Sequence, residues 1–267
     1  MVTASVSGFN SAPFEPHIGS WDAAGNYFDG LIDDVRIYPY ALSASQVSAL
    51  YHDWSDLARP TTDGLQAHYR LDGDATDSAG SNDGTNNGVT FERGVRGQSG
   101  YFDGSSGIVV PSGLVGTDSF SVSAWAKTPN GAGSGQEYIV DLRGDVDLII
   151  GQSDQASSNA TITIWDGSYS DPDIPIDDDA YRHFVGTYDG STLKLYVNGS
   201  LVLSESSSPN SSSEGSRIGQ NDGGGGGWDG NIDDVRIYDR ALSPSEIHEL
   251  YRYGSKGRDL REKLVNA

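Results

Sequence analysis

The chain contains the same 24-residue stretch twice, and this repeat limits which folds the sequence can form. Residues 228–251 read WDGNIDDVRIYDRALSPSEIHELY and residues 28–51 read FDGLIDDVRIYPYALSASQVSALY, with 15 of the 24 aligned positions identical. The offset of 200 residues stays constant upstream, where Ile18 and Gly19 align with Ile218 and Gly219. This separation indicates duplication of a whole domain, because solenoid repeats return after only about 20 to 50 residues.

The first part of each copy has the pattern of a β-strand. Val235 and Ile237 are β-branched and alternate with polar residues, which predicts a half-buried strand. With strict alternation, Asp233 lies on the apolar face, an unusual position for a charge. Asp234 and Arg236 then share the opposite face and are expected to pair there.

The second part of each copy has the signals that start a helix. Ser243 is placed as the N-cap, Pro244 as the first helical residue, and Glu246 as the partner that completes a capping box. Leu242 and Ile247 have the spacing of a hydrophobic staple. The copy is therefore expected to end in a short helix that docks on a β domain.

Charge and composition exclude several kinds of partner. The 267-residue chain has a net charge of −21, no cysteine, 30 Asp against 8 Glu, and 13 Arg against 4 Lys. Such a surface repels nucleic acid and anionic membranes, and no segment has the length of a transmembrane helix, so we expect neither nucleic-acid binding nor membrane insertion. An acidic, lysine-poor sequence resembles proteins of haloarchaea, with an ordinary acidic secreted protein as the alternative.

Many short strand patterns separated by Gly, Asp, Asn and Ser turns predict an all-β protein, an antiparallel two-sheet β-sandwich with a short C-terminal helix. We expect residues 1–57 to be a partial copy made of C-terminal strands and a helix, residues 58–64 a linker, and residues 65–255 a complete domain. Residues 256–267 either prolong the helix or form a frayed tail.

Four motifs occur in the order seen in laminin G-like domains of the concanavalin A-like lectin/glucanase superfamily. They are SFSVSAWAK at 119–127, YRHFVGTYDGS at 181–191, LKLYVNGSLV at 193–202 and IDDVRIY at 232–238, and YFDGS at 101–105 also fits. The chain resembles this family over about residues 65–255, which implies a jelly-roll sandwich. The fold hosts lectins, adhesion modules and enzymes alike, so the resemblance does not fix the ligand.

The residues that a glycosidase needs are not found in the sequence. Glucanases of this superfamily use two Glu close together on one strand, as nucleophile and acid. Glu137 stands alone, whereas Glu246 and Glu249 fall on the terminal helix. The five His have no metal-ligand spacing and there is no nucleophile elbow, so we expect the protein not to be an enzyme.

Calcium is the cofactor that the resemblance implies. Members of this family often hold one structural Ca²⁺ near the domain edge, and the matching positions here are Asp77, Asp103 and Asp233. A carboxylate on a core-facing position needs a cation or another partner, because its desolvation is costly. The alternative is that Asp77 forms an Asx-turn, Asp103 caps a turn and Asp233 accepts backbone N–H groups.

Three aromatic residues near turns are candidates for stacking on a sugar ring. Trp165 and Tyr169 flank a Gly-Ser turn, and Trp228 follows five consecutive glycines. The alternative for Trp165 and Trp228 is ordinary packing in the core or at its rim, because large aromatic side chains mostly pack. Trp125 alternates with Val122 inside a strand and is expected in the core.

Together these features predict a non-catalytic recognition or adhesion module. We expect it to bind a glycan or glycoprotein at a haloarchaeal cell surface or on a haloarchaeal virus particle, in an extracellular, cell-surface or virion location. The alternative is a structural subunit of a virion, surface filament or layer. In that case the half copy in residues 1–57 makes the subunit contacts, because unpaired strands invite pairing with another chain, and a homo-oligomer or larger assembly is expected.

Overall fold

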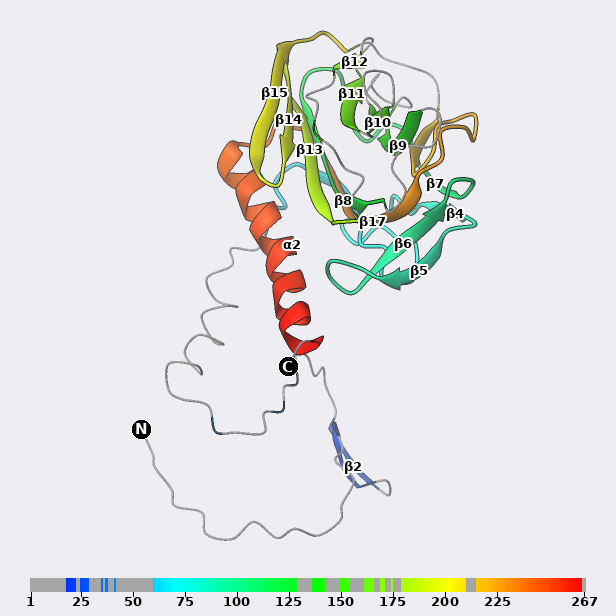
Figure 1. Cartoon of the computed structure of the whole chain (residues 1–267), viewed down its shortest axis with the longest axis vertical. Coiled ribbons are helices and arrows are strands. Elements are labelled where there is room, and N and C mark those ends of the chain that lie inside the picture. The colour runs from blue at the N-terminus through cyan, green and yellow to red at the C-terminus, as the bar shows by residue number, and fades with distance from the viewer. Residues whose placement is uncertain are drawn as a thin grey trace. The chain divides into compact units, whose positions relative to one another are not determined.

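The chain divides into two compact units, residues 1–54 and residues 55–267. The computed structural model describes residues 18–22, 25–28, 35, 37, 41, 60–128, 136–142, 149–153, 161–165, 169–170, 174, 179–209 and 215–265. In the first unit, β1 (Ser20–Asp22) and β2 (Gly25–Tyr27) pair as a short antiparallel hairpin (Figure 1). Most of the strand and helix predicted for 28–51 lies outside the described residues, and the finer domain boundaries stay a prediction.

The second unit is a sandwich of two antiparallel sheets with a C-terminal helix, which confirms the predicted fold class (Figure 1). One sheet has the order β12 (Tyr169–Ser170), β11 (Thr161–Trp165), β10 (Ile149–Ser153), β9 (Gln136–Asp141), β16 (Ser216–Ile218), β7 (Gly107–Val110), β4 (Thr85–Asn87). The other has the order β15 (Ser200–Ser206), β14 (Thr192–Val197), β13 (Arg182–Tyr188), β8 (Phe120–Lys127), β17 (Asp229–Tyr238), β6 (Gln98–Asp103), β5 (Thr90–Arg93), and β3 (Leu65–Tyr69) also pairs with β17.

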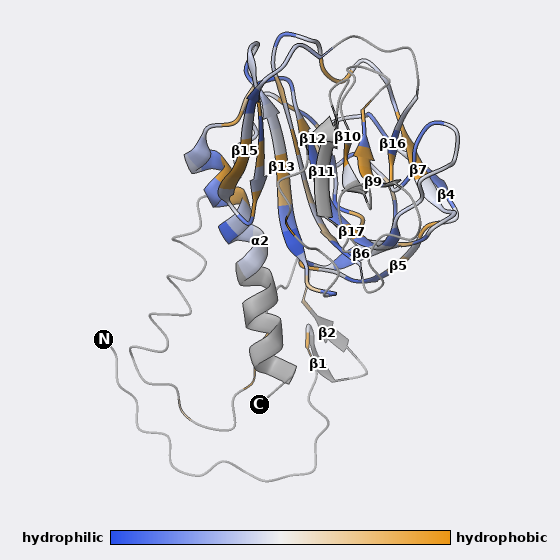
Figure 2. Cartoon of the chain, turned by 45° about the horizontal axis from the view of Figure 1, so that its top comes forward, coloured by the Kyte–Doolittle hydropathy of each residue, from blue (hydrophilic) through white to orange (hydrophobic). Residues whose placement is uncertain are grey.

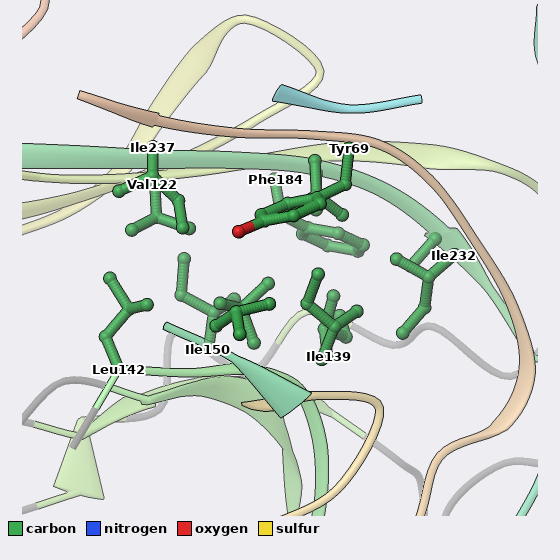
Figure 3. Close-up of a cluster of buried hydrophobic side chains, with 14 of the residues drawn as sticks. Tyr69, Val122, Ile139, Leu142, Ile150, Phe184, Ile232 and Ile237 are labelled. Carbon is green, nitrogen blue, oxygen red and sulfur yellow. The ribbon is translucent and has the colours of Figure 1, made fainter. Parts of the chain in front are cut away.

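The main core lies between the two sheets. Val122, Phe184 and Ile237 come from the eight-stranded sheet and meet Ile139 and Ile150 from the seven-stranded sheet (Figure 3). Hydrophobic residues are spread along strands of both sheets, as Figure 2 shows. Complete burial of a side chain of this size contributes about 1.5–3 kcal/mol, so this layer holds the sheets together.

The central strand β17 is buried on both faces, so the prediction of a half-buried strand was wrong. It also contains a β-bulge. Asp233 pairs with Trp125 and Arg236 pairs with Ser123, which leaves two residues of β17 opposite one residue of β8. Asp234 is the extra residue of the bulge. Its φ of 51° lies in the left-handed region, where Asp is tolerated.

The bulge reverses the expected face of Asp233. Ile237 pairs with Val122, and Trp125 lies three residues further along β8, on the other face of that strand. Asp233 therefore lies on the face opposite to Ile237, away from the main core. The sequence pattern placed the two residues together because strict alternation has no place for an extra residue.

The helix α2 (Pro244–Val265) starts as predicted. The Ser243 amide donates to Glu246 Oε2 at 2.8 Å, and the Glu246 amide donates to Ser243 Oγ at 3.4 Å, which confirms the capping box. Ile247 and Leu250 pack with Tyr238 in a second, smaller cluster on the outer face of the eight-stranded sheet. The helix continues to Val265, so residues 256–265 prolong it.

Candidate functional site

The seven-stranded sheet ends in a short hairpin that carries two of the predicted ligand-binding residues. Trp165 in β11 pairs directly with Tyr169 in β12, the edge strand. Residues that are directly opposite in an antiparallel pair share one face of the sheet. The two aromatic positions are therefore neighbours at the edge of the sandwich.

The strand register shows which face this is. Ile150 is buried in the main core and pairs with Val140, another core residue. Because successive residues of a strand alternate between faces, the preceding position Ile149 lies on the face away from the core. Ile149 pairs with Trp165. By this register, the strand positions of Trp165 and Tyr169 belong to the outer face of the seven-stranded sheet.

A row of paired positions continues from the aromatic residues across this outer face. Ile149 pairs with Asp141, and Asp141 pairs with Arg217 in β16. We define Tyr169, Trp165, Ile149, Asp141 and Arg217 as the outer row. Rings that stack on a sugar and charged groups that bind hydroxyls are the usual combination in a carbohydrate site.

The two charged residues of the outer row, Asp141 and Arg217, differ in exposure. Asp141 is completely buried, whereas the side chain of Arg217 is 16% exposed. Arg217 Nη2 donates to Asp222 Oδ1 at 2.6 Å, so Asp222 is also part of this group. Sequence reasoning missed Asp141 and Arg217, and the only signal was a charged residue inside each strand pattern.

The glycine-rich loop beside Arg217 is held in place by its own hydrogen bonds. The Asn221 side chain accepts from the Gly225 amide at 2.7 Å, and the Asn221 amide donates to the Gly225 carbonyl at 3.0 Å. The Tyr138 amide in β9 donates to the Gly226 carbonyl at 3.0 Å. A Cβ at Gly227 would lie 2.0 Å from the Gly104 carbonyl, so this close approach requires glycine.

Trp228 belongs to the core and not to an exposed binding surface, which corrects its prediction as a stacking residue. Its side chain is 1% exposed and packs in the main cluster. Its backbone is fixed at both ends, because its amide donates to Gly219 at 2.8 Å and its carbonyl accepts from Gly104 at 2.9 Å. These bonds turn the chain inward just before β17. The indole offers no open face to a sugar ring.

Two of the predicted calcium ligands are occupied with local hydrogen bonds. Asp77 accepts from the amides of His68, Ala79 and Asn82 at 2.8, 2.9 and 3.1 Å. Asp103 accepts from the amide and hydroxyl of Ser105 and from the Ser106 amide at 2.9–3.0 Å. These are the turn-forming roles that were the alternative to calcium.

The third predicted calcium ligand, Asp233, is held by backbone amides. Its Oδ2 accepts from the amides of Val95 at 2.7 Å and Arg96 at 3.2 Å. Within the part of the chain that the structure describes, no group of three or more His, Cys, Asp or Glu has a metal-binding arrangement. The three carboxylates do not fit a common calcium site, and calcium stays a prediction.

Comparison with protein families identifies the fold. The model of a laminin G family, described as the Concanavalin A-like lectin/glucanases superfamily, matches residues 102–248, more than half of the chain. The chain belongs to this superfamily. A search of curated protein sequences found no significant match.

Solved structures with the same concanavalin A-like fold include glycan-binding domains. Domain 4 of AbnA, an extracellular arabinanase from Geobacillus stearothermophilus solved with arabinotriose, is 26% identical with a TM-score of 0.58, over 70% of this chain and 98% of that domain. The binding domain of Paraclostridial Mosquitocidal Protein 1 is 20% identical with a TM-score of 0.54, over 70% of this chain and 52% of that one. A mutant of Trypanosoma rangeli sialidase is 17% identical with a TM-score of 0.56, over 79% of this chain and 38% of the sialidase.

Among the residues that the structure describes, no helix is both long and apolar enough to cross a membrane.

A second group of polar residues in the concanavalin A-like domain lies between the eight-stranded sheet and α2. Asp233, Trp125 and His183 form one row across β17, β8 and β13. Tyr251 of α2 stacks on Trp125 with ring centroids 5.8 Å apart. Among the described residues, Asp233 Oδ1, Trp125 Nε1, His183 Nδ1 and Arg236 Nη1 have no hydrogen-bond partner. Sequence reasoning missed this group because the bulge hides the shared face.

Burial shifts the pKa values of two members of this group in opposite directions. It raises the pKa of Asp233 well above its ordinary value, and the nearby charge of Asp234 adds to the effect. It lowers the pKa of His183 to about 3. Both groups therefore favour their neutral forms under α2.

These shifts predict opposite effects of pH on stability. The unfolded Asp pKa is about 3.9, so Asp233 makes the fold less stable as pH rises from there to its raised folded pKa. For His183 the folded pKa is about 3, whereas the unfolded pKa is about 6.5, so stability is lost as pH falls through this window. We expect Asp233→Asn to steepen the gain in unfolding free energy between about pH 4 and 6.5, and His183→Gln to flatten it. The measurement is urea denaturation across this pH range. If the unfolding free energy of both variants changed with pH as it does in the wild type, the roles given to Asp233 and His183 would be contradicted.

Proposed function

We propose that the chain is a non-catalytic module that binds glycan through three residues of the outer row: Trp165, Tyr169 and Arg217. The observation that carries the proposal is the register that brings Trp165 and Tyr169 into one row with Asp141 and Arg217. The arabinanase domain solved with arabinotriose gives support, because 98% of it aligns with this chain at 26% identity. The rings would stack on the apolar face of a sugar and Arg217 would donate to its hydroxyls.

The positions of the glutamates support a binding role without catalysis. Glucanases of this superfamily use two Glu close together on one strand, one as nucleophile and the other as acid. Glu137 is the only Glu in β9 and is buried. Glu246 binds Arg240 Nη2 at 2.6 Å and caps α2. None of the described strands carries two Glu.

The setting that we infer is outside the cell, at a haloarchaeal cell surface or on a virus particle. The net charge of −21 and the small share of Lys give a surface that stays hydrated and soluble in concentrated salt. Glycans and surface glycoproteins are the partners available there. Exposed apolar residues in the first repeat copy favour a second role in assembly.

Substitution of the aromatic pair tests the glycan proposal. We expect Trp165→Ala and Tyr169→Ala each to weaken binding of the best glycan at least tenfold, which is about 1.4 kcal/mol, with little change in unfolding free energy. The measurement is a glycan array in concentrated KCl that includes arabino-oligosaccharides, followed by calorimetric titration of the hits.

Tyr101→Ala is the matched control, because Tyr101 is a partly exposed aromatic residue on the other sheet. It should leave the affinity unchanged. An array without a reproducible hit, or hits whose affinity survives both substitutions in the aromatic pair, would contradict the proposed function.

A further inference from the structure

Four apolar residues of the first repeat copy are strongly exposed. The exposed fractions are 65% for Ile18, 59% for Phe28, 50% for Val35 and 80% for Ile37. The residues 200 positions later are almost completely buried: Ile218 at 0%, Trp228 at 1%, Val235 at 0% and Ile237 at 0%. The first copy therefore presents to solvent the same side-chain positions that the second copy uses for its core.

The two copies also share local backbone structure. The Phe28 amide donates to the Gly19 carbonyl at 2.7 Å, and the Trp228 amide donates to the Gly219 carbonyl at 2.8 Å. Gly19 and Gly219 both have positive φ, at 76° and 83°. The same loop closure precedes both copies of the strand, so the sequence register of the repeat is also a structural register.

The second unit shows which strands lie beside the buried residues of the second copy. Ile218 in β16 pairs with Ile108 in β7 and Val140 in β9. Ile237 in β17 pairs with Ala67 in β3 and Val122 in β8. All four covering strands lie within residues 65–141. We call residues 65–206 the body, residues 216–255 the closing segment, and residues 18–51 the first-copy segment.

We propose that the first-copy segment is an interaction surface for a laminin G-like body that lacks its own closing segment. Residues 32–38 and 232–238 both read IDDVRIY, so such a body would meet the side chains that it is shaped to receive. Its strands equivalent to β3 and β7–β9 would cover Ile18, Val35 and Ile37. This inference does not depend on glycan binding.

The body of residues 65–206 is not itself free to receive the first-copy segment. Its own closing segment already fills it through β16, β17 and α2. The sequence nevertheless contains two segments of this type. Exchange between intact copies would cover one segment only by releasing another, so the partner must bring a body with the position free.

The experiment displaces the closing segment from the body in the whole chain. Val235→Asp and Ile237→Asp place two charges where β17 meets the core, which should expel the closing segment. We expect the first-copy segment, from the same or another molecule, to fill the vacated position, so the near-ultraviolet circular dichroism and cooperative urea transition of the body are kept. Adding Val35→Asp and Ile37→Asp should then abolish both signals.

Val35→Asp and Ile37→Asp without the other two changes are the matched control and should leave the transition of the second unit unchanged. The proposal is overturned if the variant with only the second-copy changes is as unfolded as the fourfold variant. It is also overturned if light scattering shows a dimer of the wild-type chain that the control variant dissociates, because the two first-copy faces then cover each other. Neither readout involves sugar, so failure here is distinct from failure of the glycan proposal.

A disulfide test reads the register directly, because the chain has no cysteine. In the chain with Val235→Asp and Ile237→Asp, we expect Ile37→Cys and Val122→Cys to cross-link rapidly under mild oxidation. Ile37→Cys with Ile108→Cys is the control, because Ile108 is an equally buried core position that pairs with Ile218 and not with Ile237. Equal rates for the two cysteine pairs would overturn the proposed register.

Discussion

Replacing Trp228 by alanine is expected to lower the free energy of unfolding of the second unit by about 3–5 kcal/mol, the usual loss for a large aromatic side chain removed from a core. Trp228 is among the largest fully buried side chains, and the Gly104 and Gly219 backbone bonds hold its position. The backbone at this position is therefore held in place and does not move in to fill the cavity. Urea denaturation followed by near-ultraviolet circular dichroism gives the measurement.

Trp228→Phe is the matched control, because phenylalanine is the residue of the first copy at the equivalent position, Phe28. It should cost clearly less than alanine, since part of the cavity stays filled. If Trp228→Ala kept the wild-type stability but lost glycan binding, Trp228 would have to be assigned to the binding surface and not to the core.

The buried ion pair in β17 is expected to have the second large effect. Arg236 Nη2 and Asp234 Oδ1 are 3.0 Å apart, which confirms the pairing predicted from the strand pattern, and His68 Nε2 contacts the same oxygen at 2.5 Å. Burial alone would raise the pKa of Asp234, but Arg236 and His68 outweigh it and hold this pKa below its ordinary value. Arg236→Met should cost about 3–5 kcal/mol, because it leaves a buried carboxylate with one partner fewer.

Two further variants test this explanation by the same denaturation measurement. Asp234→Asn combined with Arg236→Met should lose less than Arg236→Met alone, because the uncompensated charge is removed and Asn also tolerates the positive φ at this position. Arg240→Met breaks the partly exposed pair with Glu246, and its loss should stay near 1 kcal/mol. Losses of similar size for Arg236→Met and Arg240→Met would contradict the burial argument.

The fold was predictable from sequence because its signals are local. The capping box around Ser243 and Glu246, and the strand patterns with turns between them, are read within short windows. The bulge at Asp234 was not predictable, because the residues IDDVRIY alternate well enough to hide one extra position. The face of Asp233 was wrong for that reason.

The candidate site was only partly predictable from sequence. Trp165 and Tyr169 stand out by residue type and by the turn between them. Asp141 and Arg217 join them through the strand order β10, β9, β16, which brings together residues separated by about 75 positions in the chain. Trp228 was misassigned because five glycines in front of it suggested an exposed loop. The hydrogen bonds that turn it inward come from Gly104 and Gly219.

The place of β17 in the sheet has a consequence for how the protein is made. This strand lies at the centre of the eight-stranded sheet, between β8 and β6, yet it is the last of that sheet's described strands to be synthesised. The sheet therefore stays split while the ribosome adds residues 65–228, and the emerging half-sandwich exposes its apolar interior. Pairings across more than 100 residues form slowly, and incomplete sandwiches aggregate. Protection of the growing chain is consequently most important in the interval before Tyr238 leaves the ribosome.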